Sequence, residues 1–435
     1  MPASLSSSSL SPRGARACRV SRSSSSSRRL LGLRRVFVAS ASTGSMKGSE
    51  GSVFAPSQFV ESAGDEFPSL RAAINDATSC GAFVRETDAL GQALSEAADA
   101  SNGAVTVKAY RGKVRDTYEI TNADDGRRTL VLATTDRQSA FDQLLGHVPL
   151  KGRSLNLCSC WWLAEALDRH GIPNAAMCGE DGSIAVHPNV TIMRRCEMLP
   201  IEMVVRAYVT GSTETSVWTH YKRHFHGDSA TTDPLVYCGH SFPPGLRKND
   251  AIPMGPVVTP TTKGEKDEPI SMDDAVSRGL LTAEQAKQAE ELALRMFAFG
   301  QEEASKRGLV LVDTKYELGV DPQTGEIAFA DEVHTPDSSR YWVANTYESR
   351  VKEQGLEPEN IDKEFYRLWF AGQCDMYDAS VEKPTPPPEL GEELGWRYAV
   401  LSSLIRGDAV PPPARDDERE MVGAVLGALK YNGVL

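Results

Sequence analysis

Alternating apolar and polar residues predict short β-strands from residue 105 onward. The stretches VTVKAYRGKVRDTYEI (105–120) and RTLVLATTDR (128–137) flank the turn-forming sequence TNADDG. Branched and aromatic residues on both sides of such a turn are typical of a β-hairpin. Farther along the chain, GLVLVDTKYELGV (308–320) and EIAFADEV (326–333) flank the turn DPQTG and predict a second hairpin.

Two longer stretches follow the helical period instead. Residues 282–308 begin with a capping box formed by Thr282 and Gln285, and they place apolar side chains three and four residues apart before Gly308. The stretch SLNLCSCWWLAEALDRHG (154–171) predicts another helix, which ends at Gly171. Blocks of strands and helices without an internal repeat predict an α+β protein with two lobes.

The N-terminal residues differ from the rest in composition. Residues 1–49 contain eight arginines and one lysine, many serines and no acidic residue. This composition is typical of an organelle transit peptide, so we predict a disordered transit peptide at 1–48 for import into the chloroplast stroma, with the mitochondrion as the alternative. A disordered basic arm that binds nucleic acid is the other interpretation.

Charge and hydropathy restrict the partners of the remaining chain. Loss of those nine basic residues changes the formal net charge from −12 to −21, so we expect no binding to nucleic acid. No apolar run reaches the roughly 18 residues of a membrane helix, so we expect no membrane partner. The predicted organisation is a linker with one helix (86–100) at 49–104, a β-rich N-terminal lobe at 105–205, and an α/β lobe with C-terminal helices at 206–435.

One predicted strand carries an unusual charged face. Side chains two residues apart on a strand share a face, so Asp313, Lys315 and Glu317 are expected to lie together. Charges on one face are costly to bury unless they pair or bind a ligand. A solvated outer face is the alternative explanation.

The length of the turn DPQTG determines which residues of the next strand lie opposite this charged face. If Val320 pairs with Glu326, Lys315 lies opposite Asp331 on the next strand. Carboxylates on adjacent strands can hold Mg²⁺ and connect it to substrate phosphates. The register therefore predicts a magnesium site that includes Asp331.

Groups suited to anions follow and precede this hairpin. Asp337, Ser338 and Arg340 lie in the loop after it, and arginine and hydroxyl groups bind phosphate or carboxylate. In VVRAYVTGSTETSVW, Arg206 lies on a strand and Ser212 is expected at a helix N-terminus, where free N–H groups favour anions. An ordinary N-cap serine is the alternative for Ser212.

A short glycine motif lies near the start of the fold. In YRGKVRD, Gly112 would let the backbone approach a polyphosphate, and Lys113 would supply the counter-charge. A simple turn is the alternative for so short a motif.

Seven segments in order resemble the SAICAR synthase (phosphoribosylaminoimidazole-succinocarboxamide synthase) family of purine biosynthesis, in an organelle-targeted form. They are YRGKVRDTYEI, TDRQSAFD, PLKG, VVRAYVTGS, TPTTKGEKDEPIS, VDTKYELG and DEVHTPDSSRYW, within about residues 108–400. The resemblance implies a two-lobed α+β fold with ATP and Mg²⁺ in the cleft between the lobes. It implies that ATP phosphorylates the carboxylate of carboxyaminoimidazole ribotide and that the amine of L-aspartate then displaces phosphate. It also allows a homo-oligomer.

The resemblance also implies roles for individual residues. The catalytic groups would be Lys315 and Asp313. The ATP-binding residues would be Gly112, Lys113 and Glu317, and the adenine pocket would include part of 194–202. The residues that bind the ribotide or its acidic partner would be Arg206, Ser212, Asp337, Ser338 and Arg340. The metal ligands would be Asp331 and Asp267.

Two other functions remain open at this point. A small-molecule kinase of the inositol-phosphate type also uses an Asp-x-Lys strand, but it would phosphorylate a hydroxyl group and stop there. A non-catalytic nucleotide-binding protein would have little need for Lys315, Asp331 and Arg340 together. A requirement for both L-aspartate and a carboxylated imidazole ribotide in ADP release would distinguish the ligase from both.

Overall fold

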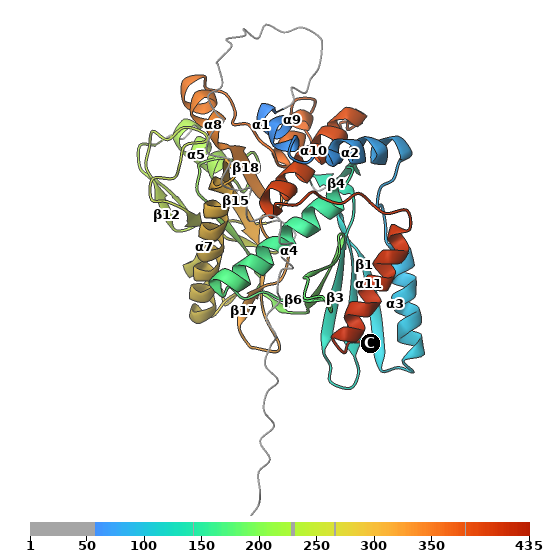
Figure 1. The fold of residues 1–435 in the computed structure, drawn as a ribbon. Coiled ribbons are helices and arrows are strands. Elements are labelled where there is room, and N and C mark those ends of the chain that lie inside the picture. Colours follow the sequence, from blue (N-terminus) through green and yellow to red (C-terminus); the bar gives the residue numbers. More distant parts are fainter. Residues whose placement is uncertain (1–56, 142, 228–230, 265–266, 379) are drawn as a thin grey trace, which may run out of the picture.

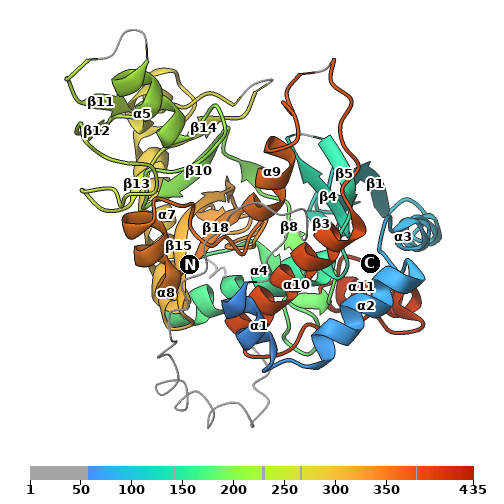
Figure 2. The same cartoon turned by 90° about the horizontal axis from the view of Figure 1, so that it is seen from above.

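The computed structural model describes residues 57–435 except 142, 228–230, 265–266 and 379, so the predicted transit peptide lies outside the described residues. The described chain forms two lobes, each built on an antiparallel sheet (Figure 1). Helix α4 (Lys151–His170) lies between them, in contact with strands of the first sheet and with helix α7 (Ala283–Ser305) of the second lobe. The view from above shows the two sheets beside each other (Figure 2).

The first sheet is covered on one face by two helices from distant parts of the chain. Its strands are β1 (Val105–Arg111), β2 (Arg115–Asn122), β3 (Arg128–Thr134), β8 (Val190–Arg194) and β6 (Ala176–Met177), with β7 (Ala185–His187) beside β8. Helices α3 (Asp88–Ala100) and α11 (Asp417–Tyr431) pack against each other and share an apolar core with this sheet. The predicted hairpin of β2 and β3 is confirmed.

The predicted linker with one helix is wrong. Helix α3 corresponds to the predicted helix, but α1 (Gln58–Gly64) and α2 (Ser69–Cys80) precede it and pack against α10 (Pro388–Arg406). Leu70 and Ile74 of α2 are fully buried, with alanines between them. Such small side chains let helices approach closely but give a weak periodic signal in the sequence.

The second sheet begins earlier in the chain than predicted. Its strands are β13 (Val257–Val258), β10 (Ile201–Arg206), β15 (Leu309–Tyr316) and β18 (Ser339–Val343), with β14 (Thr261–Thr262) also on β10. The predicted boundary at 205–206 is therefore wrong, because β10 belongs to the second sheet. The C-terminal helices are not confined to this lobe either, since α11 lies on the first sheet.

The predicted helices α4 and α7 are confirmed. Gly171, with φ of 59°, caps α4 at its C-terminus, and the capping box of Thr282 and Gln285 begins α7. Helix α7 ends at Ser305, three residues before Gly308, and packs on β15 and β10.

The remaining elements are small. Strands β9 (Glu197–Met198), β16 (Leu318–Val320) and β17 (Ile327–Phe329) form a three-stranded sheet, and two hairpins are formed by β4 (Arg137–Ala140) with β5 (Gln143–His147) and by β11 (Leu235–Tyr237) with β12 (His240–Phe242). The remaining helices are α5 (Val217–His226), α6 (Met272–Ser277), α8 (Ala344–Tyr347), a π-helical turn (Glu348–Glu353) and α9 (Glu364–Ala371).

The predicted register of the second hairpin is wrong by one residue. Val320 pairs with Ile327, and Asp321 closes the turn through its N–H, which donates to the carbonyl of Glu326 (2.8 Å). The carboxylate of Asp321 also accepts from the backbone of Gln323 (2.9 Å). Because Asp321 pairs with Glu326 through the backbone, the turn spans the four residues 322–325 rather than five.

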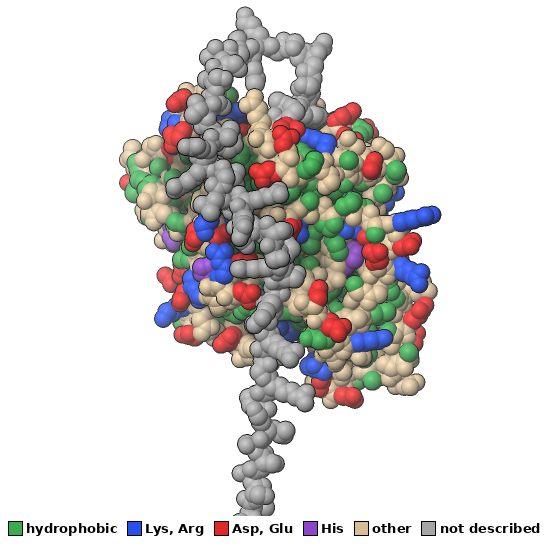
Figure 3. Space-filling model, in the orientation of Figure 1, with side chains coloured by type: hydrophobic (Ala, Val, Ile, Leu, Met, Phe, Trp, Pro, Cys, Tyr) green, Lys and Arg blue, Asp and Glu red, His purple; other side chains and the backbone are tan. Residues whose placement is uncertain are grey.

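The surface mixes both charge signs. Acidic side chains are spread over the face seen in Figure 3, with lysines and arginines among them. Among the described helices, none combines the length and the apolar character that a membrane crossing requires.

Gly152 tests the packing between α4 and the first sheet. A Cβ atom there would lie 2.4 Å from the Thr134 carbonyl oxygen and 2.6 Å from Asn189 Nδ2. We expect Gly152→Ala to lower the free energy of unfolding by about 1–3 kcal/mol, because the strand must move to admit the methyl group. In urea denaturation, the control Gly423→Ala on α11, where a Cβ meets nothing within 4 Å, should be neutral or stabilising. Equal stability of Gly152→Ala and the unchanged chain would contradict this packing.

Candidate active site

Arg115 connects the two lobes at the start of β2. Its guanidinium forms an ion pair with Asp331 through Nη1 and with Glu332 through Nη2, the latter at 2.9 Å. Burial opposes the charge of Arg115, but the two carboxylates outweigh it and raise the pKa of the guanidinium. A cavity of ≈ 20 Å³ lies between these residues and the first sheet. Neither Arg115 nor Glu332 was among the predicted site residues.

Lys315 lies among carboxylates from two strands. Its Nζ is 2.6 Å from Glu202 Oε1 on β10 and 3.9 Å from Glu317 Oε1. Burial lowers the pKa of Lys315, but the neighbouring carboxylates, Glu202 first, raise it overall, so the ammonium stays charged. Asp331 contributes to the same effect. Lys315 therefore lies near Glu317 and Asp331, but the predicted pairing of Lys315 opposite Asp331 is wrong together with the register.

The carboxylates around Lys315 and Arg115 outnumber the cations by one. Four carboxylates (Glu202, Glu317, Asp331 and Glu332) face three cations (Lys315, Lys263 and Arg115), and Lys263 Nζ lies 2.5 Å from Glu317 Oε2. Within the described ranges, no three acidic, histidine or cysteine side chains are close enough to hold a metal by themselves. Magnesium usually takes one or two carboxylates and completes its shell with phosphate and water oxygens. Asp331 and Glu317 fit that requirement.

Among the described residues, Asp267 makes no contact that would assign it a role. It is exposed, in the turn that follows β14, where the Thr262 N–H donates to the Glu268 carbonyl (2.9 Å). The role of Asp267 as a metal ligand stays a prediction.

The backbone of the glycine turn at Gly112 is held by a buried arginine. Arg137 donates to the carbonyl oxygens of Gly112 (2.9 Å) and Lys113 (3.3 Å), and it pairs with Asp116 (2.8 Å). A Cβ on Gly112 would lie 3.2 Å from the Arg115 carbonyl oxygen, so a larger residue would press on this turn. The Lys113 side chain is exposed. The turn is thus rigid and presents a cation.

Three neighbouring strands align a row of charged side chains. Arg206 on β10, Asp313 on β15 and Arg340 on β18 are paired across the second sheet. Asp313 Oδ2 lies 2.5 Å from Arg340 Nη1 and 3.4 Å from Arg206 Nη1. All three are largely buried, and the acidic neighbours of Arg340 raise its pKa although burial opposes them. Asp313 therefore orients two guanidinium groups.

Ser212 lies at one end of this row, but the predicted helix N-terminus there is wrong. Helix α5 begins at Val217, and Ser216 is its N-cap. Gly211, with φ of 109°, turns the chain before Ser212, whose hydroxyl donates to Glu364 Oε1 (2.9 Å). The sequence GSTETS contains two candidate N-cap serines, and only the second has its side chain directed to the helix.

Asp337 is enclosed by lysines rather than open to a ligand. Lys151 Nζ lies 3.3 Å and Lys363 Nζ 3.2 Å from its Oδ2, and the Tyr398 hydroxyl donates to Oδ1 (2.6 Å). Burial alone would raise the pKa of Asp337, but the two lysines hold it well below its usual range. Burial lowers the pKa of Lys363 to about 8. Asp337 thus fixes the loop between β17 and β18.

Ser338 supports the same loop. Its hydroxyl lies 3.1 Å from the Thr335 hydroxyl, and its carbonyl accepts from the Lys315 N–H (3.1 Å). The backbone of Ser338 therefore connects the loop to the strand that carries Lys315.

Sequence reasoning missed the charged residues of the segment IDKE, 361–364. Asp362 accepts from the backbone of Tyr341 (2.6 Å) and of Glu364 (2.7 Å), and burial raises its pKa to about 7. Lys363 contacts Asp337, and Glu364 contacts Ser212. The only signal was three consecutive charged residues beside the apolar start of a helix, which is also common on surfaces.

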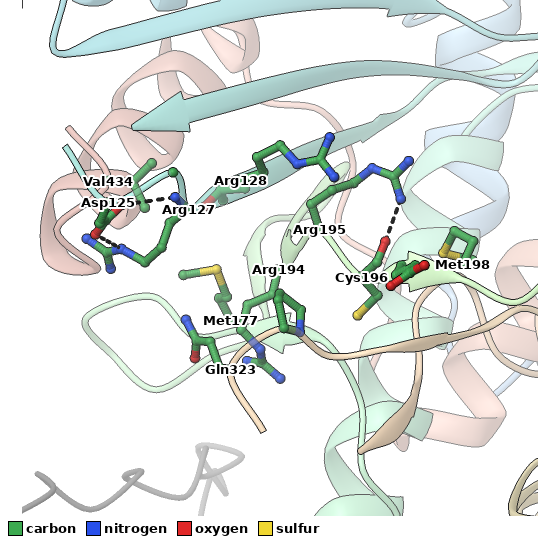
Figure 4. Close-up of a pocket in the computed structure, with 14 residues that line it drawn as sticks. Asp125, Arg127, Arg128, Met177, Arg194, Arg195, Cys196, Met198, Gln323 and Val434 are labelled. Atoms are coloured by element: carbon green, nitrogen blue, oxygen red, sulfur yellow. Dashed lines mark hydrogen bonds and ion pairs between the residues drawn. The ribbon is translucent and has the colours of Figure 1, made fainter. Parts of the chain in front are cut away.

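A larger pocket lies at the far end of the first sheet. Its volume is ≈ 780 Å³, and it includes residues 194–198 of the segment predicted for adenine (Figure 4). Four arginines line it, and each forms an ion pair: Arg127 with Asp125, Arg128 and Arg195 with Glu119, and Arg194 with Asp321. Strand β2 separates this end from Arg115 by roughly 20 Å at about 3.3 Å per residue. The adenine pocket stays a prediction.

Charged side chains from two α+β lobes meet around Arg115 and Lys315, an arrangement suited to an enzyme with anionic substrates. The family model described as SAICAR synthetase matches residues 108–384. The chain belongs to the SAICAR synthetase family and is a ligase of purine biosynthesis.

Individual relatives agree with this assignment. A phosphoribosylaminoimidazole-succinocarboxamide synthase of Legionella pneumophila (strain Lens) is 46% identical over 315 residues, 71% of this chain and 92% of the relative. A relative from Arabidopsis thaliana with the same name, designated chloroplastic, is 44% identical over 328 residues, 74% of this chain and 72% of the relative. The structure of SAICAR synthase from Saccharomyces cerevisiae complexed with SAICAR has a TM-score of 0.55 and 26% identity, covering 71% of this chain and 97% of that chain. The predicted family, fold class and enzyme class are confirmed, and the kinase alternative is not favoured.

Proposed function

We propose that the chain joins L-aspartate to the carboxylate of carboxyaminoimidazole ribotide, using ATP and Mg²⁺, and releases SAICAR, ADP and phosphate. One observation carries this proposal: strand β15 presents Asp313 and Lys315 on one face. Asp313 orients the guanidinium groups of Arg206 and Arg340, which suit the ribotide phosphate. Lys315, at the other end of this face, lies among the carboxylates described above, with Glu202 as its nearest partner. Substrate anion and phosphoryl donor can therefore meet on one strand.

The chemistry requires charge neutralisation more than a protein nucleophile. A carboxylate is a poor electrophile, and its conversion to an acyl phosphate makes it reactive toward the aspartate amine. Lys315 would neutralise the transferred phosphoryl group, and Gly112 with Lys113 would hold the polyphosphate. Asp331 and Glu317 would hold Mg²⁺, which supplies further neutralisation of phosphate charge.

ADP release tests the proposal directly. With ATP and Mg²⁺, ADP should form at the full rate only when both the ribotide and L-aspartate are present, and SAICAR should accumulate in equal amount. ADP release that depends on a hydroxyl acceptor, with no requirement for L-aspartate, would support the kinase alternative instead.

Arg340→Lys tests the substrate end of the site. Arg340 uses one nitrogen for Asp313 and a second toward Glu364, a forked geometry that lysine cannot reproduce. We expect KM for the ribotide to rise about tenfold or more, by the 1.5–3 kcal/mol of a charge-assisted hydrogen bond, with KM for ATP little changed. An unchanged KM for the ribotide in steady-state assays would remove Arg340 from the substrate site.

We further propose that the chain works in the plastid after loss of its N-terminal residues. The basic, acid-free composition of residues 1–49 and the relatives designated chloroplastic, from Arabidopsis thaliana and Vigna aconitifolia, support this proposal. A chain that starts at Ser52 should keep full activity and stability, because it retains α1 and α2.

The matched comparison is a chain that starts at Glu86. It lacks α1 and α2, whose Val60, Leu70 and Ile74 belong to the main core. Exposure of that core should lower the melting temperature by several degrees. A chain from Ser52 that fails to fold or turn over would show that the N-terminal residues are structural.

A further inference from the structure

Glu364 occupies the centre of an anion-binding arrangement. Its carboxylate accepts from the Ser212 hydroxyl at 2.9 Å, and it lies 3.6 Å from Arg340 Nη2 and 3.5 Å from Arg367 Nη1. These groups come from the loop after β10, from β18 and from α9. A hydroxyl and two guanidinium groups that converge on one point are the donors that a phosphate monoester requires.

The carboxylate of Glu364 is held loosely by the arginines. Charge-assisted hydrogen bonds are usually about 2.7–2.9 Å long, so both of its arginine contacts are long. Arg340 makes its short contact, 2.5 Å, with Asp313 instead. Another buried glutamate, Glu303, shows the opposite pattern, with three contacts of 2.8 Å to Arg169, Lys306 and Arg307. Glu303 is a structural ion-pair centre, whereas Glu364 is not clamped in this way.

The charge count favours a phosphate that replaces the Glu364 carboxylate over a phosphate that binds beside it. Three guanidinium groups (Arg206, Arg340 and Arg367) face two carboxylates (Asp313 and Glu364), which leaves one positive charge. A phosphate monoester brings about two negative charges near neutral pH. If Glu364 stays, the cluster becomes negative by one charge; if Glu364 moves out, the charges balance.

A path from solvent to this position exists. Ser212 is exposed, and the Arg367 side chain keeps 27% of its surface accessible. The Glu364 side chain is 9% exposed and contacts both of them. Burial works against its charge, but Arg340, Arg367 and Ser212 hold the pKa of Glu364 below its ordinary value, so it competes as an anion.

We propose that Glu364 is an internal competitor for the phosphate group of the substrate: its carboxylate occupies the phosphate position between Ser212, Arg340 and Arg367, and substrate binding displaces it. The inference rests on the proposed function for the identity of the substrate. The displacement itself concerns any phosphate monoester. Glu364 would thereby set the affinity for the ribotide and keep the guanidinium groups apart and oriented between turnovers.

Calorimetric titration of the full chain with ribose 5-phosphate and with inorganic phosphate tests this exchange. Glu364→Gln keeps the size of the side chain but removes the competing charge, so both probes should bind at least about tenfold more tightly. The matched control Glu303→Gln removes an equally buried carboxylate and should lower the melting temperature without changing either affinity. In the double variant Glu364→Gln with Arg340→Gln, the gain should disappear.

Three outcomes would overturn the proposal. Weaker or unchanged binding of both probes to Glu364→Gln would show that the carboxylate supports the site rather than competes for it. A gain that survives in the double variant would place the phosphate elsewhere, for example at the glycine turn. If Glu364→Gln does not fold, Glu364→Asp, which withdraws the carboxylate by one methylene group, must still bind ribose 5-phosphate more tightly, or the proposal fails. Because no variant is tested by turnover, these results stand even if the ligase reaction is not the one proposed.

Discussion

Replacement of Lys315 by methionine is expected to lower kcat by about a hundred- to a thousandfold, the range for loss of one preorganised electrostatic contact. Methionine keeps the length of the side chain but leaves Glu202, which pairs with Lys315 Nζ at 2.6 Å, without its cation. The transferred phosphoryl group would then lie beside an unpaired Glu202 carboxylate and without the ammonium that neutralises it. Steady-state kcat at saturating substrates, measured beside a thermal melt, separates lost chemistry from lost folding.

Lys306→Met is the matched control for that change. Lys306 also pairs with two carboxylates, Glu302 and Glu303, but at the end of α7. It should lower stability modestly and leave kcat unchanged. A folded Lys315→Met chain with near-normal kcat would remove Lys315 from the phosphoryl site.

Asp331→Asn is expected to lower kcat at least about a hundredfold and to raise the Mg²⁺ concentration required for half-maximal activity. Asparagine keeps the shape of the side chain and can still accept from Arg115, which also keeps its 2.9 Å contact with Glu332. The melting temperature should therefore change little. The loss would come from the missing charge near the bound metal.

Titration of kcat against Mg²⁺ checks this expectation. Asp168→Asn, an exposed acid on α4, is the control and should leave the Mg²⁺ dependence unchanged. A folded Asp331→Asn chain with normal kcat at the usual Mg²⁺ concentration would mean that Asp331 serves only to connect the lobes through Arg115.

Local patterns were enough for the helices and strands that have strong periodicity. Capping by Thr282 and Gln285 and the long apolar stripe located α7, and Gly171 located the end of α4. Helices α1, α2 and α11 were missed or misplaced because their partners lie elsewhere in the chain. Helix α11, for example, is stabilised by the first sheet, and the sequence of residues 417–431 does not indicate which element the helix packs against.

The candidate site was predictable where neighbours in space are neighbours on one strand. The shared face of Asp313 and Lys315 follows from alternation alone, and the structure confirms it. Contacts between distant segments did not follow: Arg115 with Asp331, and Lys315 with Glu202, join residues more than 100 positions apart. Register is equally hard to predict, because the backbone pairing of Asp321 with Glu326 shortens the turn of the second hairpin by one residue.

The position of α11 has a consequence for the order in which the protein can fold during synthesis. The apolar face of the first sheet, which includes Ile120 and Val131, receives Val425 and Leu429 from the last helix. The strands of that sheet leave the ribosome roughly 300 residues before this helix, at about 5–20 residues per second. For at least about fifteen seconds, α3 is therefore the only helix that covers this face, and the half that α11 later covers stays exposed. A chaperone that binds apolar β-surface can act during that interval. The first lobe is thus the part of the nascent chain most exposed to aggregation, although its strands are made first.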